Sequence, residues 1–358
     1  MTAQGVSMRN LADGASGSVA RGQRVAWADL CRVVAIYGVL LIHSCGPFFY
    51  DYGKAPLSDW LSANALDSLM RVAVPLFVMI SGAMLLRPGM SIATPKEILR
   101  RALKVLIPLL FWSLAYLYRN NALGSHGQGV WTIFSQPAVY HLWFVYMIAG
   151  LYLLLPFLQA IYEALRAKPV TAVYFFAVWF VVTSVPLYWP MPVLKIMQQT
   201  SFLGYGGFFI LGGLIAGIRR ESIPRWLCVA VYAASSAVTF YLTWRFSVNA
   251  NTAVERAYVY FTPNVVIAAI AAFLAFSTIE LSGRAAAVCQ WLGDRSFIIF
   301  FVHVAVLEQV RFSATIRAAT EHLPTFFVIL LISFGTFFFS CLVAAIIRLI
   351  PGASRVAG

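Results

Sequence analysis

The sequence predicts an all-α, polytopic membrane protein with about ten transmembrane helices, and three observations support this fold class. Of the 358 residues, 61% are hydrophobic and only 11% are charged, whereas soluble domains usually carry about 25% charged residues. The mean hydropathy of +0.81 leaves too few polar side chains to cover a soluble globule of this size. Apolar runs of the length that crosses a bilayer, about 20 residues, recur along the chain.

Ten apolar runs are expected to cross the membrane, and several of them begin or end in Trp or Tyr, as is typical of membrane interfaces. We expect one transmembrane domain over residues 27–351. A polar, disordered cytoplasmic tail (1–26) is expected before it and a short cytoplasmic segment (352–358) after it. The predicted spans are Leu30–Phe49, Leu69–Leu86, Ala102–Tyr118, Tyr140–Tyr162, Pro169–Trp189, Phe202–Ile218, Trp226–Trp244, Thr262–Leu281, Ser296–Val310 and Pro324–Pro351.

The basic residues indicate how the spans are oriented. The net charge is +13, but Lys and Arg occur in short clusters between the apolar runs. This is the pattern of juxtamembrane positive charge rather than of a nucleic-acid-binding face, so no nucleic acid partner is expected. One side of the membrane receives 15 basic residues and the other receives 7. The positive-inside rule therefore predicts an inner-membrane protein with both termini in the cytoplasm.

The cysteines favour neither a metal site nor a disulfide framework. The five of them are scattered, mostly inside or beside apolar runs, and no CxxC or CxxH pair occurs. Closely spaced pairs of that kind are the usual sign of a zinc site. No metal is therefore expected.

The first predicted span carries the clearest polar pattern. Asp29 and Arg32 are three residues apart, so they share a helix face and are expected to form an ion pair. His43 lies eleven residues beyond Arg32, which is close to three helical turns and about 16 Å along the axis. Each ionisable group inside a membrane costs about 2.5–3.5 kcal/mol on insertion scales and therefore needs a reason.

Two interpretations of this pattern are open. Arg32 alone could be an anchor that snorkels to the interface, and His43 alone could be a hydrogen-bond partner between helices. Their position on one face of the same span instead favours a polar channel that crosses half of the membrane.

The first span reads DLCRVVAIYGVLLIHSC and resembles the opening of acyltransferase family 3 membrane proteins, which carry an arginine, ten residues and then a histidine there. Four further segments are similar to stretches of this family in the same order, so the resemblance covers nearly the whole chain after residue 26. They are VPLFVMISGAMLL with Ser81 and Gly82, RRALKVLIPLLFW with Arg101, Lys104 and Pro108, HLWFVYMIAGLYLLLPFL from His141, and LGDRSFIIFFVHVAVLE with Gly293, Ser296 and His303.

The resemblance implies a membrane O-acyltransferase, most often an O-acetyltransferase. Such proteins move an acyl group from cytoplasmic acyl-coenzyme A to a hydroxyl of a carbohydrate on the far side of the membrane. This chain is similar to the short stand-alone members, which lack an added extracytoplasmic hydrolase-like domain and act on lipid-linked or exported glycans. It implies acyl-coenzyme A as a co-substrate, no bound cofactor, and a glycan and the lipid bilayer as partners. The sequence does not indicate an oligomeric state.

The resemblance also implies the reacting group. A thioester is already activated, so the enzyme mainly has to activate a sugar hydroxyl. His43 would do this as a general base, which contributes roughly 10²–10⁴-fold. It could instead carry the acyl group as an acyl-imidazole, and the sequence leaves both routes open.

Donor binding is expected from Arg32, Arg101 and Lys104, which all fall at the cytoplasmic side. The alternative is that they only set the topology, which is the interpretation preferred for Arg87, Lys96 and Arg100. Lys104 stands where many family members have a second arginine. Lysine binds phosphate as a point charge and lacks the two-pronged geometry of a guanidinium.

The remaining site residues have weaker support. Acceptor binding is expected from His141, Trp143 and Tyr146 at the outer end of the fourth span. Supporting roles are expected for Asp29, Arg32, Ser81 and His303: Ser81 would mainly permit close packing beside Gly82, and His303 would mainly form a core hydrogen bond.

A secondary transporter or flippase for a glycan or a small metabolite is the alternative function class. Transporters often have paired halves with broken helices, and proton coupling commonly uses intramembrane acids. The sequence has no evident pairing of halves and few such acids. A purely structural membrane subunit would leave the Arg32–His43 face unexplained.

Overall fold

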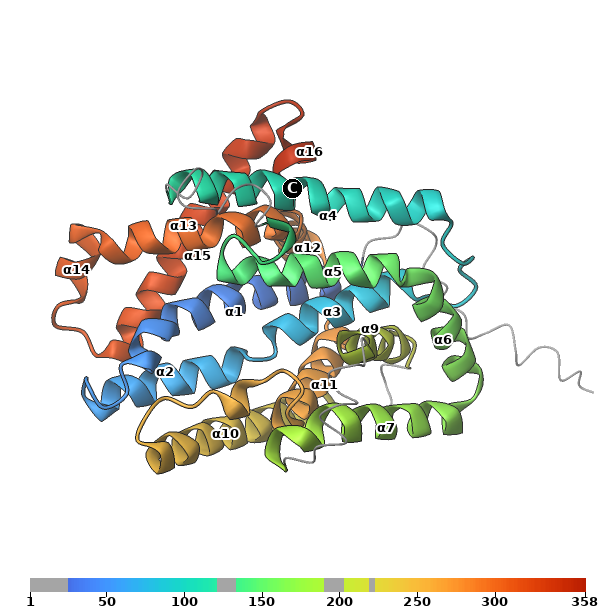
Figure 1. Ribbon diagram of the computed structural model, residues 1–358, viewed down its shortest axis with the longest axis horizontal. Helices are drawn as coiled ribbons and strands as arrows, with labels where there is room; N and C mark the ends of the chain where they lie inside the picture. The colour runs from blue at the N-terminus through green and yellow to red at the C-terminus, as the bar shows by residue number, and fades with distance from the viewer. Residues whose placement is uncertain (1–24, 121–132, 190–202, 219–222) are drawn as a thin grey trace, which may run out of the picture.

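The computed structural model describes residues 25–120, 133–189, 203–218 and 223–358, and these residues form helices and loops only. The expected tail up to residue 24 and much of the predicted loop after Arg119 lie outside these ranges. The helices pack into one bundle, in which several of the long ones run roughly along the horizontal direction of Figure 1, so the all-α fold class is confirmed. The helices are α1 (Ala26–Tyr50), α2 (Leu57–Met70), α3 (Ala73–Leu85), α4 (Pro95–Arg119), η3 (Tyr140–Leu142), α5 (Trp143–Leu153), α6 (Leu155–Ala167), α7 (Pro169–Tyr188), α9 (Leu203–Ala216), α10 (Arg225–Ala250), η5 (Arg256–Tyr258), α11 (Pro263–Ser277), α12 (Gly283–Gly293), α13 (Ser296–Phe312), α14 (Ala314–Thr320), α15 (Thr325–Leu349) and α16 (Ala353–Ala357).

The structure bears on the number of membrane spans through the length and composition of its helices. Among the described residues, six helices are long and apolar enough to cross a membrane, with α2 and α3 counted together as Leu57–Leu85. Two bent helix pairs raise this number to eight. The apolar helix α9 is shorter, and α4 is not among the six. The protein is therefore a multi-pass membrane protein, but the predicted count of ten is not confirmed.

Three predicted spans differ in shape. The stretch from Tyr140 to Tyr162 is not one straight helix, because α5 and α6 meet at 67°. Pro156 lies in the first turn of α6, where no helical hydrogen bond needs its missing N–H. In the middle of one continuous helix the same proline would remove a hydrogen bond and break the helix. The ninth predicted span, α13, is preceded by α12 at an angle of 61°. The helix before the second predicted span begins earlier, at Leu57, so much of the segment between the first two predicted spans (50–68) is helical.

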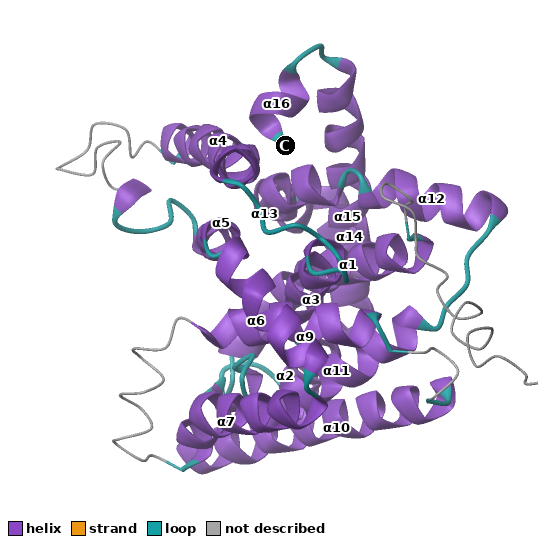
Figure 2. Cartoon of the chain, turned by 90° about the vertical axis from the view of Figure 1, so that its right-hand side faces the viewer, coloured by secondary structure: helices purple, strands orange, loops and turns teal. Residues whose placement is uncertain are grey.

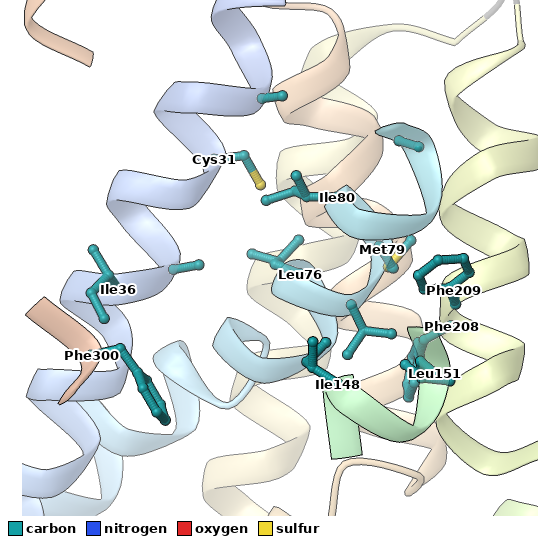
Figure 3. Packing of buried hydrophobic residues seen from close by; sticks show 14 of the residues in the cluster. Cys31, Ile36, Leu76, Met79, Ile80, Ile148, Leu151, Phe208, Phe209 and Phe300 are labelled. Atoms are coloured by element: carbon teal, nitrogen blue, oxygen red, sulfur yellow. The ribbon is translucent and has the colours of Figure 1, made fainter. Parts of the chain in front are cut away.

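Helix α1 occupies the centre of the bundle and contacts α2, α3, α11, α12, α13 and α15. Cys31 and Ile36 of α1 have no solvent exposure. Figure 3 shows Cys31 directed towards Ile80 of α3, with Phe208 and Phe209 of α9 on the far side of the same cluster. The polar residues of the first span are therefore carried by the most enclosed helix.

Helices α3 and α9 pack backbone against backbone. A Cβ atom on Gly82 would lie 1.7 Å from the carbonyl oxygen of Phe209, and one on Gly212 would lie 2.1 Å from that of Met79. Only glycine fits at such distances, and small residues commonly allow this approach between membrane helices. The contact fixes α3 at one side of α1.

Helix α4 forms one edge of the bundle together with the C-terminal segment. It begins with a capping box in which Thr94 and Glu97 satisfy each other's backbone N–H groups, followed by Pro95 in the first turn. The indole Nε1 of Trp112 donates a hydrogen bond of 3.0 Å to the carbonyl of Ala357. Figures 1 and 2 both show α16 beside α4. The chain's last described residues thus cover the space between α4 and α13.

Candidate functional site

A cavity of about 940 Å³ lies between α4, α13, α1 and α5, and the C-terminal segment forms part of its wall. Basic side chains dominate its polar lining, and no Asp or Glu lines it among the residues that the structure describes. A space with one sign of charge and apolar walls favours an anionic ligand. The basic lining residues are Arg32, Lys96, Arg100, Arg101, Lys104, Arg348 and Arg355.

The three predicted donor-binding residues all lie in this cavity, but their partners differ. Arg32 donates to Asp29 at 2.6 Å, so the ion pair expected from their spacing is present, and the Arg32 side chain stays 30% exposed. Asp29 in turn packs against Gly293 of α12. The Nε atom of Arg101 is buried without a hydrogen-bond partner in the described structure. Because buried donors are normally satisfied, this atom has room for an acceptor from a ligand.

Ser81 also lines the cavity, and its hydroxyl donates to the carbonyl of Phe77 at 2.9 Å. The close helix contact expected for Ser81 is instead made by its neighbour Gly82. The role of Ser81 in helix packing therefore stays a prediction. A helix has room for both functions because successive residues point in different directions.

Apolar side chains form the wall of the cavity towards the middle of the bundle. Phe77 and Phe144 lie there with ring centroids 5.9 Å apart, and Phe144 lies 5.4 Å from Phe300. Phe300 also contacts His141 and His303, at 5.5 and 5.7 Å between ring centroids. Phe300 is thus at once a wall of the basic cavity and a neighbour of two histidines.

Three histidines from distant parts of the sequence meet beyond Phe300. The rings of His43 on α1 and His303 on α13 are stacked, with centroids 5.3 Å apart and an interplanar angle of 23°. His141 of η3 meets His303 edge to face at 4.9 Å. We call these three residues the histidine cluster. Their proximity could not be deduced from the sequence, which separates them widely.

The hydrogen bonding of His303 fixes its tautomer. Its Nδ1 atom lies 2.6 Å from the carbonyl oxygen of Phe300. A carbonyl only accepts, so Nδ1 carries the proton and Nε2 keeps its lone pair. The Nε2 atom of His303 and both ring nitrogens of His141 are buried without a well-aligned hydrogen bond in the described structure. The cluster therefore offers several unsatisfied polar atoms to a ligand.

The predicted acceptor residues do not stay together. His141 is 2% exposed and belongs to the histidine cluster. Tyr146 donates its hydroxyl to the carbonyl of Ile133 at 2.6 Å and is therefore occupied within the protein. Trp143 is partly buried and lies with Tyr260, stacked at 6.1 Å, and with Tyr205 at 5.8 Å. Of the three, Trp143 is the residue that packs with two tyrosines, Tyr205 and Tyr260.

A buried ion pair lies at the same end of the bundle as His43. Arg71, between α2 and α3, binds Asp67 through two contacts of 2.7 and 2.5 Å. Its guanidinium lies 3.9 Å above the ring of Tyr258, whose hydroxyl donates to Asn64 at 2.6 Å. The Asp67–Arg71 spacing of four residues was a local signal for this pair. Its proximity to Tyr258 depends on packing between distant helices.

Sequence reasoning missed four basic residues of the cavity. Lys96 and Arg100 were assigned to topology alone, yet both line the cavity on the exposed face of α4. Arg348 and Arg355 come from the last helix pair, and Arg348 donates to the carbonyl of Asp294 at 2.5 Å. The three-residue and four-residue spacings on α4 could have indicated a shared face. No sequence signal links the C-terminal segment to α4.

Comparisons with known proteins agree with the resemblance. A family model described as an acyltransferase domain matches residues 25–345. The chain is similar to the succinoglycan biosynthesis protein ExoH of Rhizobium meliloti (strain 1021), with 32% identity over 107 residues. This alignment covers 28% of the chain and 28% of ExoH. No solved structure matches.

Proposed function

Because this chain belongs to the acyltransferase family, we propose that it moves an acyl group, of which acetyl is the simplest, from cytoplasmic acyl-coenzyme A to a glycan hydroxyl, with His43 as the reacting base. The family membership makes the protein a membrane-bound acyltransferase. The donor, the acceptor and the role of each residue belong to the proposal. The one observation that carries it is that Phe300 separates a basic cavity from the histidine cluster by the width of a single side chain.

The basic cavity suits coenzyme A. Coenzyme A carries several phosphate groups, and seven basic side chains line the cavity. Arg101, with its unsatisfied Nε, and Lys104 are placed on one face of α4 opposite Arg32. Guanidinium groups bind phosphate with two parallel hydrogen bonds, and an ammonium adds a point charge. The apolar wall at Phe77 and Phe144 suits the thin pantetheine arm and its thioester.

Direct transfer needs one proton acceptor. An imidazole nitrogen of His43 takes the proton of the sugar hydroxyl while that oxygen attacks the thioester carbonyl. The carbon–sulfur bond then breaks, and the imidazolium returns the proton to the leaving thiolate, which gives an ester and free coenzyme A. A neutral imidazole is required at the start, and enclosure beside a second imidazole favours it over a cation.

A two-step route uses the same atoms. One ring nitrogen of His43 attacks the thioester carbonyl, and coenzyme A leaves as the thiol with the proton that the other ring nitrogen gives up. The sugar hydroxyl then attacks the acyl-imidazole, and its proton returns to the imidazole that is released. Both routes need the His43 ring held in one orientation. His303 supports this because its own ring is fixed by the bond to Phe300 and stacks on His43. His303 acts as a positioning residue in this proposal.

The acceptor is proposed to bind at the end of the bundle opposite Asp29 and Arg32. Trp143, Tyr205 and Tyr260 lie there with their rings in contact, and aromatic faces are suitable surfaces for sugar rings. The charge distribution supports an outer location for this end, in an inner-membrane protein with both termini in the cytoplasm. The likeness to a protein named for succinoglycan biosynthesis supports an exported or lipid-linked polysaccharide as the acceptor.

The test is transfer itself. Purified protein in lipid nanodiscs, given acetyl-coenzyme A labelled in the acetyl group and a glycan extract from the native cells, should produce labelled ester and free thiol in equal amounts. A secondary transporter or flippase would release no thiol. Absence of thiol release with every tested acyl-coenzyme A would overturn the proposal.

A further inference from the structure

A second cavity, of about 610 Å³, lies between α7, α10 and α11, away from the basic cavity and the histidine cluster. Figure 1 shows these three helices together at the lower edge of the bundle. The cavity runs along α10 from Ala234 to Phe246, which is about 18 Å at 1.5 Å per residue. This length is similar to one leaflet of the hydrocarbon core, about 15 Å.

The walls of this cavity are apolar, and its charge is confined to one end. Val238, Leu242 and Ile267 line the middle, and Val238 and Ile267 are exposed at 47% and 44%. The polar atoms of Asn264 are used inside the protein, because it accepts from Tyr188 at 2.7 Å and donates to Thr239 at 2.8 Å. The walls therefore suit a hydrocarbon chain rather than a polar ligand.

Arg256 is the cationic residue of this cavity. It lies in η5, in the connection between α10 and α11. Its guanidinium is 5.4 Å from the centre of the Phe246 ring. Its neighbour Glu255 accepts instead from the hydroxyl of Tyr50 at 2.6 Å. No ion pair to Arg256 occurs among the residues that the structure describes. A cation above an apolar groove at a membrane interface matches a lipid phosphate.

The loop that carries Arg256 leads directly to the proposed acceptor site. Glu255 fixes the loop to the end of α1, seven residues beyond His43. Tyr258 packs under Arg71, and Tyr260 stacks on Trp143. Tyr260 follows Arg256 by four residues, so their Cα atoms are at most about 14 Å apart. A saccharide attached to a phosphate at Arg256 could span that distance to Tyr260 and Trp143. This continuity distinguishes the cavity from an ordinary groove between lipid-facing helices.

We propose that this cavity binds the hydrocarbon chain of a lipid-linked acceptor, a long-chain isoprenoid phosphate that carries the glycan, with its phosphate at Arg256. The choice of a glycan carrier rests on the proposed function. The binding of an isoprenoid phosphate does not, and it can be measured without any acyl transfer. The proposal selects a lipid-linked glycan over a free exported polymer as the acceptor.

Two adjacent alanines of α10 provide a matched pair of variants. Ala234 lines the cavity and Ala233 does not, and both are exposed. Ala234→Trp should fill the cavity and weaken the binding of a fluorescent polyprenyl phosphate to the nanodisc-embedded protein at least tenfold. Ala233→Trp should leave the affinity unchanged. Equal affinity in the two variants, or an equal loss in both, would overturn the proposal.

A second pair tests the charge. Arg256→Gln should weaken polyprenyl phosphate binding about five-fold, as expected for one basic residue near a lipid phosphate, and Arg245→Gln, an exposed arginine of α10 outside the cavity, should not. Phosphatidylglycerol in excess should displace the probe much less well than unlabelled polyprenyl phosphate does. Equal displacement by both lipids would reduce the cavity to a general lipid site and overturn the proposal.

Acyl transfer to two kinds of acceptor tests the lipid site separately from the acyltransferase activity. In the Ala234→Trp variant, acyl transfer to the lipid-linked glycan should fall at least tenfold, while thiol release with a water-soluble oligosaccharide acceptor stays at the wild-type level. Equal transfer to both acceptors would overturn the lipid site and leave the acyltransferase proposal standing. Polyprenyl phosphate binding with no thiol release from any donor would overturn the acyltransferase proposal instead.

Discussion

His43 and His303 stack their imidazole rings 5.3 Å apart although they belong to helices α1 and α13, far apart in the chain. The contact is made where α1 and α13 pack together, beside Phe300, which also lines the basic cavity. The reacting centre is therefore a property of the packed bundle and not of the first span alone.

The first prediction concerns this stacked pair. His303→Ala should lower kcat about tenfold or more, because His43 loses a fixed neighbour while its own ring remains. His303→Asn should restore part of the rate, since its amide N–H can donate to the Phe300 carbonyl as Nδ1 does. The measurement is the pH profile of kcat in both variants, with the KM for acyl-coenzyme A as a control. A purely structural role would lower protein yield but leave the profile of the surviving enzyme in place.

The second prediction concerns the basic cavity. Arg101→Ala and Lys104→Ala should each weaken the binding of a non-hydrolysable acyl-coenzyme A analogue, by roughly 10–100-fold for the arginine and less for the lysine. Isothermal titration measures the affinity. Arg166→Ala is the control, because Arg166 pairs with Glu163 at 2.9 Å outside the cavity. If all three variants keep the wild-type affinity, the cavity arginine and lysine serve only the topology.

The first-span pattern could be read from the sequence because it depends on helix geometry alone. A spacing of three places Asp29 beside Arg32 on any helix, and the ion pair is present. His141 was predicted to bind the acceptor because Trp143 is close to it in the sequence. Its contact with His303 depends on how α13 packs, which the sequence does not show. The loop residues Tyr258 and Tyr260 carried no periodic signal at all. Contacts between distant helices need side-chain packing that one sequence does not encode in a local pattern.

The bends inside the predicted spans were missed for a related reason. Hydropathy finds apolar runs but not the bends inside them, so the α5–α6 break at Leu154 and the α12–α13 break were invisible. Pro156 was a usable signal for the first break. Lys96 and Arg100 of α4 were interpreted as topology signals because hydropathy does not reveal which face of a helix lines a cavity.

The third prediction concerns the α3–α9 contact. Gly82→Ala should destabilise the protein by several kcal/mol, because the new methyl group would meet the Phe209 carbonyl at 1.7 Å and force the helices apart. Gly150→Ala is the matched control, a helical glycine with open space around its Cβ position, where alanine should be neutral or stabilising. Thermal unfolding in detergent, followed by size exclusion, measures both. Equal melting temperatures would contradict the tight packing.

The fourth prediction concerns orientation. A reporter fused after Pro88 should read cytoplasmic, and one at Asn251 should read external, as the 15-to-7 distribution of basic residues indicates. Asn251 ends α10 in the left-handed region, at the end of the bundle where Tyr50 binds Glu255. A cytoplasmic signal at Asn251 would place His43 towards the cytoplasmic side of the membrane and would contradict acyl delivery across the membrane.

The most direct test is the loss of His43 itself. His43→Ala should reduce acyl transfer by about 10²–10⁴-fold, the contribution of a general base, while the variant still folds and binds acyl-coenzyme A. It should also abolish any acyl-enzyme that an acid quench traps in the wild type. His322→Ala, at an exposed histidine outside the cluster, should transfer at the wild-type rate. A well-folded His43→Ala variant that keeps more than a few tenths of the wild-type transfer would contradict the catalytic role of His43.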